Sequence, residues 1–150
     1  EAVGKTAALA TSLLDWLDHG EAYAAAMVEV ATRLASELDR LGLPMHRTGG
    51  GFTASHQFAI DATEWGGGHE AALRLRRANL LTSAIGLPGF DGMAGLRLGT
   101  PEIVRWGMGA DDMGELAALI VEGLRGNPDD VAERTTAFRQ RFTTVHYVRQ

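Results

Sequence analysis

The stretch from 95 to 107 constrains the fold more than any other part of this chain, because it encodes a strand, a turn and a helix start in direct succession. Leucines flank Arg97 on both sides, so a strand here would bury both leucines on one face, and the guanidinium would project from the opposite face. Thr100 and Pro101 then predict a helix start, since threonine can accept a hydrogen bond from a free N–H and proline fits the first helical position. The stretch therefore predicts a sheet from which Arg97 projects.

Two glycines stand on either side of this arginine. Gly95 and Gly99 remove side chains next to Arg97, which lets a ligand or another backbone come close. From the spacing alone, the simpler interpretation is that Arg97 is a solvated surface residue and Arg105 a charge on a short helix. Binding of a ligand by Arg97 is the alternative.

The composition excludes several classes of partner. The 150 residues suffice for one domain with a real core. Net charge is −5 and the basic residues are scattered, so we expect no nucleic-acid partner. Cysteine is absent and the five histidines lack ligand spacing, so we expect no disulfide and no metal site. No apolar run reaches membrane-span length and no signal sequence is recognisable at the start, so we expect a cytoplasmic protein with no membrane partner.

The first 42 residues predict two helices. Leucines at helical spacing predict a helix over 1–20 that ends at His19-Gly20. Apolar residues every three or four positions predict a second helix over 21–41, ended by Gly42 and Pro44.

The middle of the chain predicts short strands at 45–48, 58–60 and 80–83, in addition to the strand around Arg97. The glycines at 49–51 indicate a flexible turn. A phosphate-binding loop is the alternative interpretation, but a strand rather than a helix follows. We expect His56 to be a hydrogen-bonded residue at the edge of a site rather than a general base.

The remaining segments predict helices at 69–78, 113–125 and 130–142, and a frayed or extended end over 143–150. In the first of these helices Ala72, Leu73 and Leu75 should face inward, and the arginines at 74, 76 and 77 should be solvated. Asp112 and Glu115 have capping-box spacing, and Asp129 can cap the last helix. Helices at both ends with short strands between them predict an α+β fold, in which helices cover one face of a small, mostly antiparallel sheet.

The run Gly-Leu-Arg-Leu-Gly-Thr-Pro, followed by Arg105, Gly107 and the acidic Asp111-Asp112, resembles the C-terminal domain of serine hydroxymethyltransferases and their aldolase and transaldolase relatives. The resemblance extends from about residue 9 to residue 142, but it covers only the C-terminal part of a complete family member. It implies the small domain of a pyridoxal-phosphate (PLP) enzyme of fold type I. Residues 1–42 would link to a large PLP-binding domain, and residues 43–150 would form the small domain.

The resemblance also implies functional residues. The arginine matching Arg97 grips the α-carboxylate of the substrate, a task that suits a planar fork with several N–H donors. The residues that would support this site are Arg105, Gly95, Gly99, Thr100 and His56. We expect no catalytic residue in this chain, because its only lysine, Lys5, lies far from the family's cofactor-binding lysine motif. PLP would be bound mainly by the large domain, and the chain alone would be inactive.

The segment before the central strand bears on the reaction. Folate-using members carry an Asn-x-Asn pair here, whose second asparagine helps to hold the pterin. This chain has Ser83-Ala84-Ile85 and a shorter loop over 86–94. Because isoleucine cannot form hydrogen bonds, tetrahydrofolate is doubtful as a cofactor. We expect a folate-independent aldolase or transaldolase that acts on a β-hydroxy-α-amino acid and an aldehyde.

Two alternatives stay open. One is folate-dependent serine/glycine hydroxymethyl transfer, and the other is a non-catalytic assembly module with the same fold. Family members commonly form dimers, so the resemblance implies a homodimer or a higher homo-oligomer.

Overall fold

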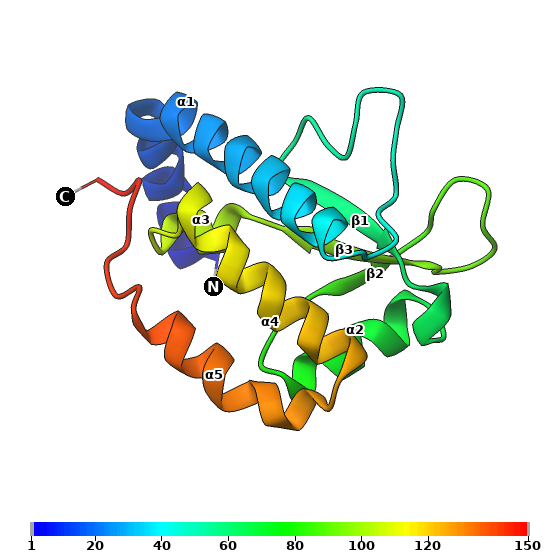
Figure 1. Cartoon of the computed structure of the whole chain (residues 1–150). Helices are drawn as coiled ribbons and strands as arrows, with labels where there is room; N and C mark the ends of the chain where they lie inside the picture. Colours follow the sequence, from blue (N-terminus) through cyan, green and yellow to red (C-terminus); the bar gives the residue numbers. More distant parts are fainter. Residues whose placement is uncertain (1, 150) are drawn as a thin grey trace.

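The computed structural model describes residues 2–149, which form an α+β domain with a three-stranded antiparallel sheet (Figure 1). The helices are α1 (Ala2–Arg40), α2 (Gly68–Arg77), α3 (Pro101–Arg105), α4 (Met113–Arg125) and α5 (Pro128–Gln140), with short 3-10 turns at Thr63–Trp65 and Ala110–Asp112. The strands are β1 (Gln57–Asp61), β2 (Ser83–Ile85) and β3 (Gly95–Gly99). Their spatial order is β1-β3-β2, so the strand that carries Arg97 lies in the middle. This confirms the predicted fold class.

The sheet has one buried and one open face. Leu96 and Leu98 of β3 are buried, as are Phe58 and Ile60 of β1. These side chains share one hydrophobic core with the inner faces of α1 and α4. Because side chains alternate along a strand, Arg97 projects from the opposite face, and it is exposed. The predicted burial pattern of this strand is confirmed.

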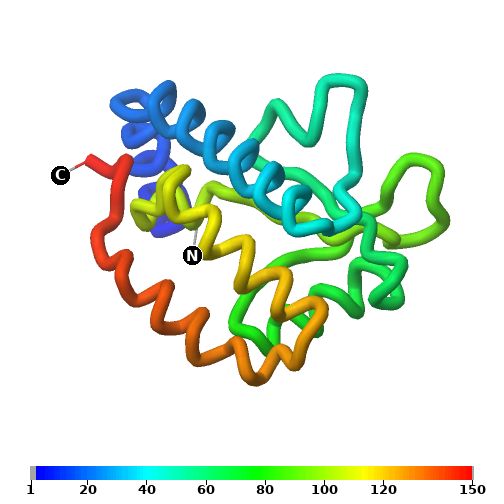
Figure 2. The backbone as a smooth tube through the Cα atoms, in the orientation of Figure 1, coloured from blue at the N-terminus to red at the C-terminus, as the bar shows by residue number. Residues whose placement is uncertain are grey.

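Helix α1 is continuous, so the predicted break at His19-Gly20 is wrong. In Figures 1 and 2 the first turns of this helix, in dark blue, run in a different direction from its later turns, so the helix is bent. Gly20 does not take a positive φ, and the ring of Trp16 covers it. An interior glycine weakens a helix by only about 1 kcal/mol, which packing can offset. Gly42, with φ of 81°, follows the true end as predicted.

The strand segments also differ from the prediction in part. Residues 45–48 form no strand, and contribute isolated bridges from Met45 to Ile60 and from Thr48 to Gly51. The second of these bridges closes the glycine turn. The strand expected at 80–83 begins only at Ser83, because Asn79 takes a left-handed φ of 60° and the chain leaves α2 irregularly.

Two predicted helix caps are wrong. The carboxylate of Asp112 accepts a hydrogen bond from the N–H of Gly109 (2.8 Å), while Glu115 pairs with Arg141 (2.7 Å) instead of closing a capping box. Helix α5 begins at Pro128, and its cap is Asn127 rather than Asp129. Proline favours the first helical position, so the helix begins two residues earlier than predicted, and the side chain of the residue before the proline becomes the cap.

Helix α2 packs differently from the prediction. Ala71 and Leu75 are buried, whereas Leu73 is 43% exposed. Arg74 and Arg77 are not simply solvated. Arg74 donates to the carbonyl oxygen of Gly123 (3.1 Å) in α4. Arg77 forms an ion pair with Asp129, and this hydrogen-bonded guanidinium lowers the pKa of that carboxyl. The two arginines therefore fasten α2 to α4 and α5, which leaves Arg76 as the solvated one.

The C-terminal segment from residue 143 to residue 149 is extended and runs back to α1 (Figures 1 and 2). The N–H of His146 donates to the carbonyl oxygen of Arg105 (2.7 Å), and Tyr147 stacks on Tyr23 with ring centroids 5.0 Å apart. The N–H of Arg149 donates to Asp15 (2.9 Å). None of the helices described over residues 2–149 is long and apolar enough to cross a membrane.

Candidate functional site

Arg97 stands in the middle of the open sheet face. The register places it between Ala59 of β1 and Ser83 of β2. Its Nε donates a hydrogen bond to the Oγ of Ser83 at 2.9 Å. Strand alternation explains the direction of the side chain, and the central position of β3 explains why both neighbouring strands meet beside it.

Within the part of the chain that the structure describes, the guanidinium of Arg97 has no anionic partner. Within residues 2–149, eleven of the thirteen arginines bind a carboxylate or a backbone carbonyl, and only Arg76 and Arg97 do not. A guanidinium has five N–H donors, of which Ser83 occupies one. The remaining donors of Arg97 are available to a carboxylate or phosphate from outside.

The two glycines beside Arg97 have different surroundings. A Cβ at Gly95 would lie 2.7 Å from Cγ of Leu87 and 2.9 Å from Cγ2 of Ile85, so the space it leaves is filled by the protein's own side chains. Gly99 is exposed, and the nearest atom to a Cβ there would be 3.7 Å away. An apolar wall therefore stands on one side of Arg97, and an open floor on the other.

Thr100 and His56 hold the end of β3. The N–H of Thr100 donates to the carbonyl oxygen of His56 (2.9 Å). The hydroxyl of Thr100, fully buried, donates to the carbonyl oxygen of Met27 (2.8 Å) in α1. Thr100 thus ties the strand to β1 and α1 instead of capping α3 with its side chain. His56 contributes its backbone, and its side chain is exposed.

Arg105 lies away from Arg97 and faces α1. Its guanidinium is 3.6 Å from the carboxylate of Asp15 and lies over the ring of Tyr23, 5.1 Å from the centroid. The hydroxyl of Tyr23 donates to the carbonyl oxygen of Pro101 (2.7 Å). The contacts of Arg105 therefore fasten α3 to α1 and do not reach the open sheet face.

Sequence reasoning missed two contacts of the site. In the sequence, Ser83 stands out only because folate-using family members have an asparagine at this position. Its contact with Arg97 depends on the register between β2 and β3. Leu87 reaches Gly95 from the loop over 86–94. Neither register nor loop path is encoded by local periodicity, so only the three-dimensional arrangement reveals these neighbours.

The described residues do not by themselves fit a PLP site. Lys5, the only lysine in the sequence, is exposed near the start of α1. A Cβ on any glycine of the 49–51 turn would have nothing within 4 Å, so no other segment closes this turn into a phosphate cradle. Across residues 2–149, no three histidine, aspartate or glutamate side chains gather to hold a metal ion.

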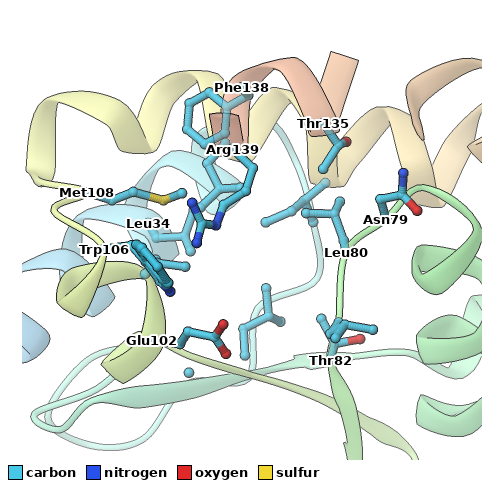
Figure 3. A pocket seen from close by; sticks show the side chains of 16 residues that line it. Leu34, Asn79, Leu80, Thr82, Glu102, Trp106, Met108, Thr135, Phe138 and Arg139 are labelled. Atoms are coloured by element: carbon cyan, nitrogen blue, oxygen red, sulfur yellow. The ribbon is translucent and has the colours of Figure 1, made fainter. Parts of the chain in front are cut away.

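A separate cavity of about 310 Å³ lies beneath the opposite face of β3, between the sheet and α5 (Figure 3). Leu98, Ile120 and Phe138 are among its apolar lining residues. At its rim, Arg139 lies over the ring of Trp106, 4.3 Å from the centroid. Because Leu98 and Arg97 point to opposite faces of the strand, this cavity is not part of the Arg97 site.

The fold identifies the class of protein. The helix-rich α+β domain with its small antiparallel sheet matches the C-terminal domain of PLP enzymes of fold type I. A crystal structure of L-threonine transaldolase from Pseudomonas fluorescens in its internal aldimine state superposes with a TM-score of 0.82 at 28% sequence identity. The match covers 92% of this chain and 32% of that chain.

The sequence relatives narrow the class. An α-methylserine aldolase from Variovorax paradoxus is 51% identical over 148 residues, and one from a Ralstonia species is 43% identical; each match covers 97% of this chain and 34% of the relative. A serine hydroxymethyltransferase from Cenarchaeum symbiosum is 35% identical, with 94% and 34% covered. No family model matches the chain.

The chain is thus homologous to the C-terminal part of PLP-dependent aldolases, transaldolases and hydroxymethyltransferases, which confirms the resemblance seen in the sequence. It spans about a third of the length of the curated relatives that it matches.

Proposed function

We propose that this chain is the C-terminal, substrate-binding part of a PLP-dependent enzyme that makes or breaks the Cα–Cβ bond of β-hydroxy-α-amino acids. The observation that carries the proposal is Arg97, which lies on the open face of a sheet and has no anionic partner among residues 2–149. The similarity of nearly the whole chain to α-methylserine aldolases supports it. The substrates would be an amino acid and an aldehyde.

In this proposal Arg97 binds the α-carboxylate of the amino acid through two parallel hydrogen bonds. The open floor at Gly99 lets the ligand approach, and the wall of Ile85 and Leu87 limits the site on the other side. Thr100 and His56 support the site by fixing the end of β3. Arg105 supports it indirectly, by fastening α3 to α1.

We further propose that residues 1–42 link to a large domain outside this chain, which mainly binds PLP, and that residues 43–150 form the small domain. Support comes from α1, whose first half exposes a row of large apolar side chains. Leu9, Leu13 and Leu17 are 60%, 56% and 80% exposed, whereas Leu34 and Leu38 in the second half are buried. An apolar row of this kind suits a contact with further protein. We also propose that the complete enzyme is a homodimer or a higher homo-oligomer.

Within this class we propose a folate-independent aldolase or transaldolase. Ile85 packs with Leu87 over Gly95, so it offers an apolar surface where a pterin would need a hydrogen bond. The alternative is folate-dependent hydroxymethyl transfer, which the similarity to serine hydroxymethyltransferases favours.

The test of the proposed site is Arg97→Ala in the complete enzyme. Loss of a charge-assisted bidentate pair should raise the KM for the amino acid by about ten- to a hundredfold. Arg76→Ala is the matched control, because Arg76 is the other arginine of the described residues without a carboxylate or carbonyl partner, and its KM should stay at the wild-type value. If the KM of Arg97→Ala equals that of the control, Arg97 does not bind the substrate.

A further inference from the structure

We propose that Ser83 is the positioning residue for Arg97, and that it selects the edge of the guanidinium that receives the substrate carboxylate. The inference rests on the proposed function of Arg97. Ser83 and Arg97 are direct cross-strand partners, and the Nε of Arg97 donates to the Oγ of Ser83 at 2.9 Å.

The bond at Nε determines which donors remain. A guanidinium can grip a carboxylate along the edge that contains Nε, or at the end formed by its two terminal nitrogens. Ser83 occupies Nε, so the end with the terminal nitrogens is the one left free for a bidentate pair. A ligand carboxylate is thereby received along the axis of the side chain.

The surroundings give Arg97 no second restraint. Its other cross-strand neighbour, Ala59, has no polar side-chain atom, and Gly99 beside it has no side chain. Among residues 2–149, Ser83 is the only hydrogen-bond partner of the Arg97 side chain. Arginine has many rotamers, so without this bond the ligand itself would have to order the guanidinium on binding. Ser83 orders it beforehand.

The first experiment measures steady-state kinetics of Ser83→Ala in the complete enzyme. Loss of the restraint should raise the KM for the amino acid by about three- to tenfold, with kcat little changed. Ser83→Thr keeps a hydroxyl at the same position in a strand-compatible side chain and should restore a KM near that of the wild type. Thermal unfolding of both variants shows whether they are folded.

The second experiment repeats Ser83→Ala in the Arg97→Ala background. If Ser83 acts through Arg97, the second substitution should not change the KM further. An additional rise of the same size would mean that Ser83 acts independently of Arg97, and it would overturn the inference. The inference also fails if Ser83→Ala keeps the wild-type KM while Arg97→Ala raises it, a result that leaves the proposed function intact. Failure of Arg97→Ala to change the KM would instead remove the proposed function itself.

Discussion

Gly68 lies in a close contact between a helix and the sheet. A Cβ at this position would overlap the carbonyl oxygen of Gly95 and lie 3.1 Å from Cα of Ala84. The N–H of Gly68 donates to the carbonyl oxygen of Met93 (2.7 Å), just before β3. The first turn of α2 thus touches the backbone of β3, which carries Arg97, and of β2 beside it. A side chain at residue 68 would push the helix away from these two strands.

We therefore expect Gly68→Ala to lower the free energy of unfolding by about 1–3 kcal/mol, the usual cost of overpacking a well-packed contact. Urea unfolding of the complete enzyme and its variants measures it. The control is Gly114→Ala in α4, where a Cβ would have no atom within 4 Å. Alanine there should be neutral or stabilising by up to about 1 kcal/mol, because it favours the helix. Equal stability of the two variants would contradict the tight contact seen at Gly68.

At the scale of the elements, local sequence predicted most helices and the central strand well. Helix ends at Gly42 and Gly126 follow from glycine as a stop signal, and β3 follows from alternation around Arg97. The helix end predicted at Gly20 is wrong, because a glycine ends a helix only where the backbone leaves the helical region. The backbone at Gly20 stays helical. The ring of Trp16 covers Gly20 there, a contact that glycine as a stop signal does not anticipate.

For the candidate site, the sequence likewise predicts some features and misses others. The direction of Arg97 follows from strand period, which is local. Its contact with Ser83 depends on strand register, and the filling of the space at Gly95 by Leu87 depends on the path of a loop. The resemblance implies that Arg105 supports the site, and in the structure its side chain points toward Asp15 in α1. Two residues that are close in sequence can face different parts of the fold when a strand-to-helix turn lies between them.

The β2 strand and the loop after it carry the prediction on folate. With Ile85 and Leu87 packed over Gly95, we expect the proposed complete enzyme to cleave a β-hydroxy-α-amino acid such as threonine at the same rate with and without tetrahydrofolate. The measurement is aldehyde release from each amino acid, with and without the folate, and serine is included as a comparison. Strong stimulation of serine cleavage by tetrahydrofolate, with micromolar affinity, would favour the hydroxymethyltransferase alternative.

For the molecule as a whole, the open sheet face around Arg97 and the leucine row of α1 (Leu9, Leu13 and Leu17) remain exposed in the described chain. The C-terminal segment reinforces this arrangement, because Arg149 contacts Asp15 and Asp18 and so holds the first half of α1 against the domain. In the proposed complete enzyme, the domain would form one side of a larger active site.

We expect that the 150-residue chain by itself does not bind PLP covalently. Lys5, the only lysine in the sequence, is exposed on α1. Mixing the chain with PLP, reducing with borohydride and weighing the product should give no stoichiometric adduct. Lys5→Arg serves as the control for any minor labelling of this side chain. A stoichiometric adduct that disappears in Lys5→Arg would show that this lysine anchors the cofactor.

The middle position of β3 has a consequence for how such enzymes diversify. Strands pair with β3 on both sides of Arg97, so the proposed carboxylate-binding residue is shielded from change at the edges of the sheet. The wall beside it comes instead from β2 and the loop after it, where insertions and substitutions are tolerated more easily. If Arg97 binds the amino acid as proposed, exchange of the segment from residue 85 to residue 94 would alter which side chains or co-substrates are accepted and leave the carboxylate contact unchanged.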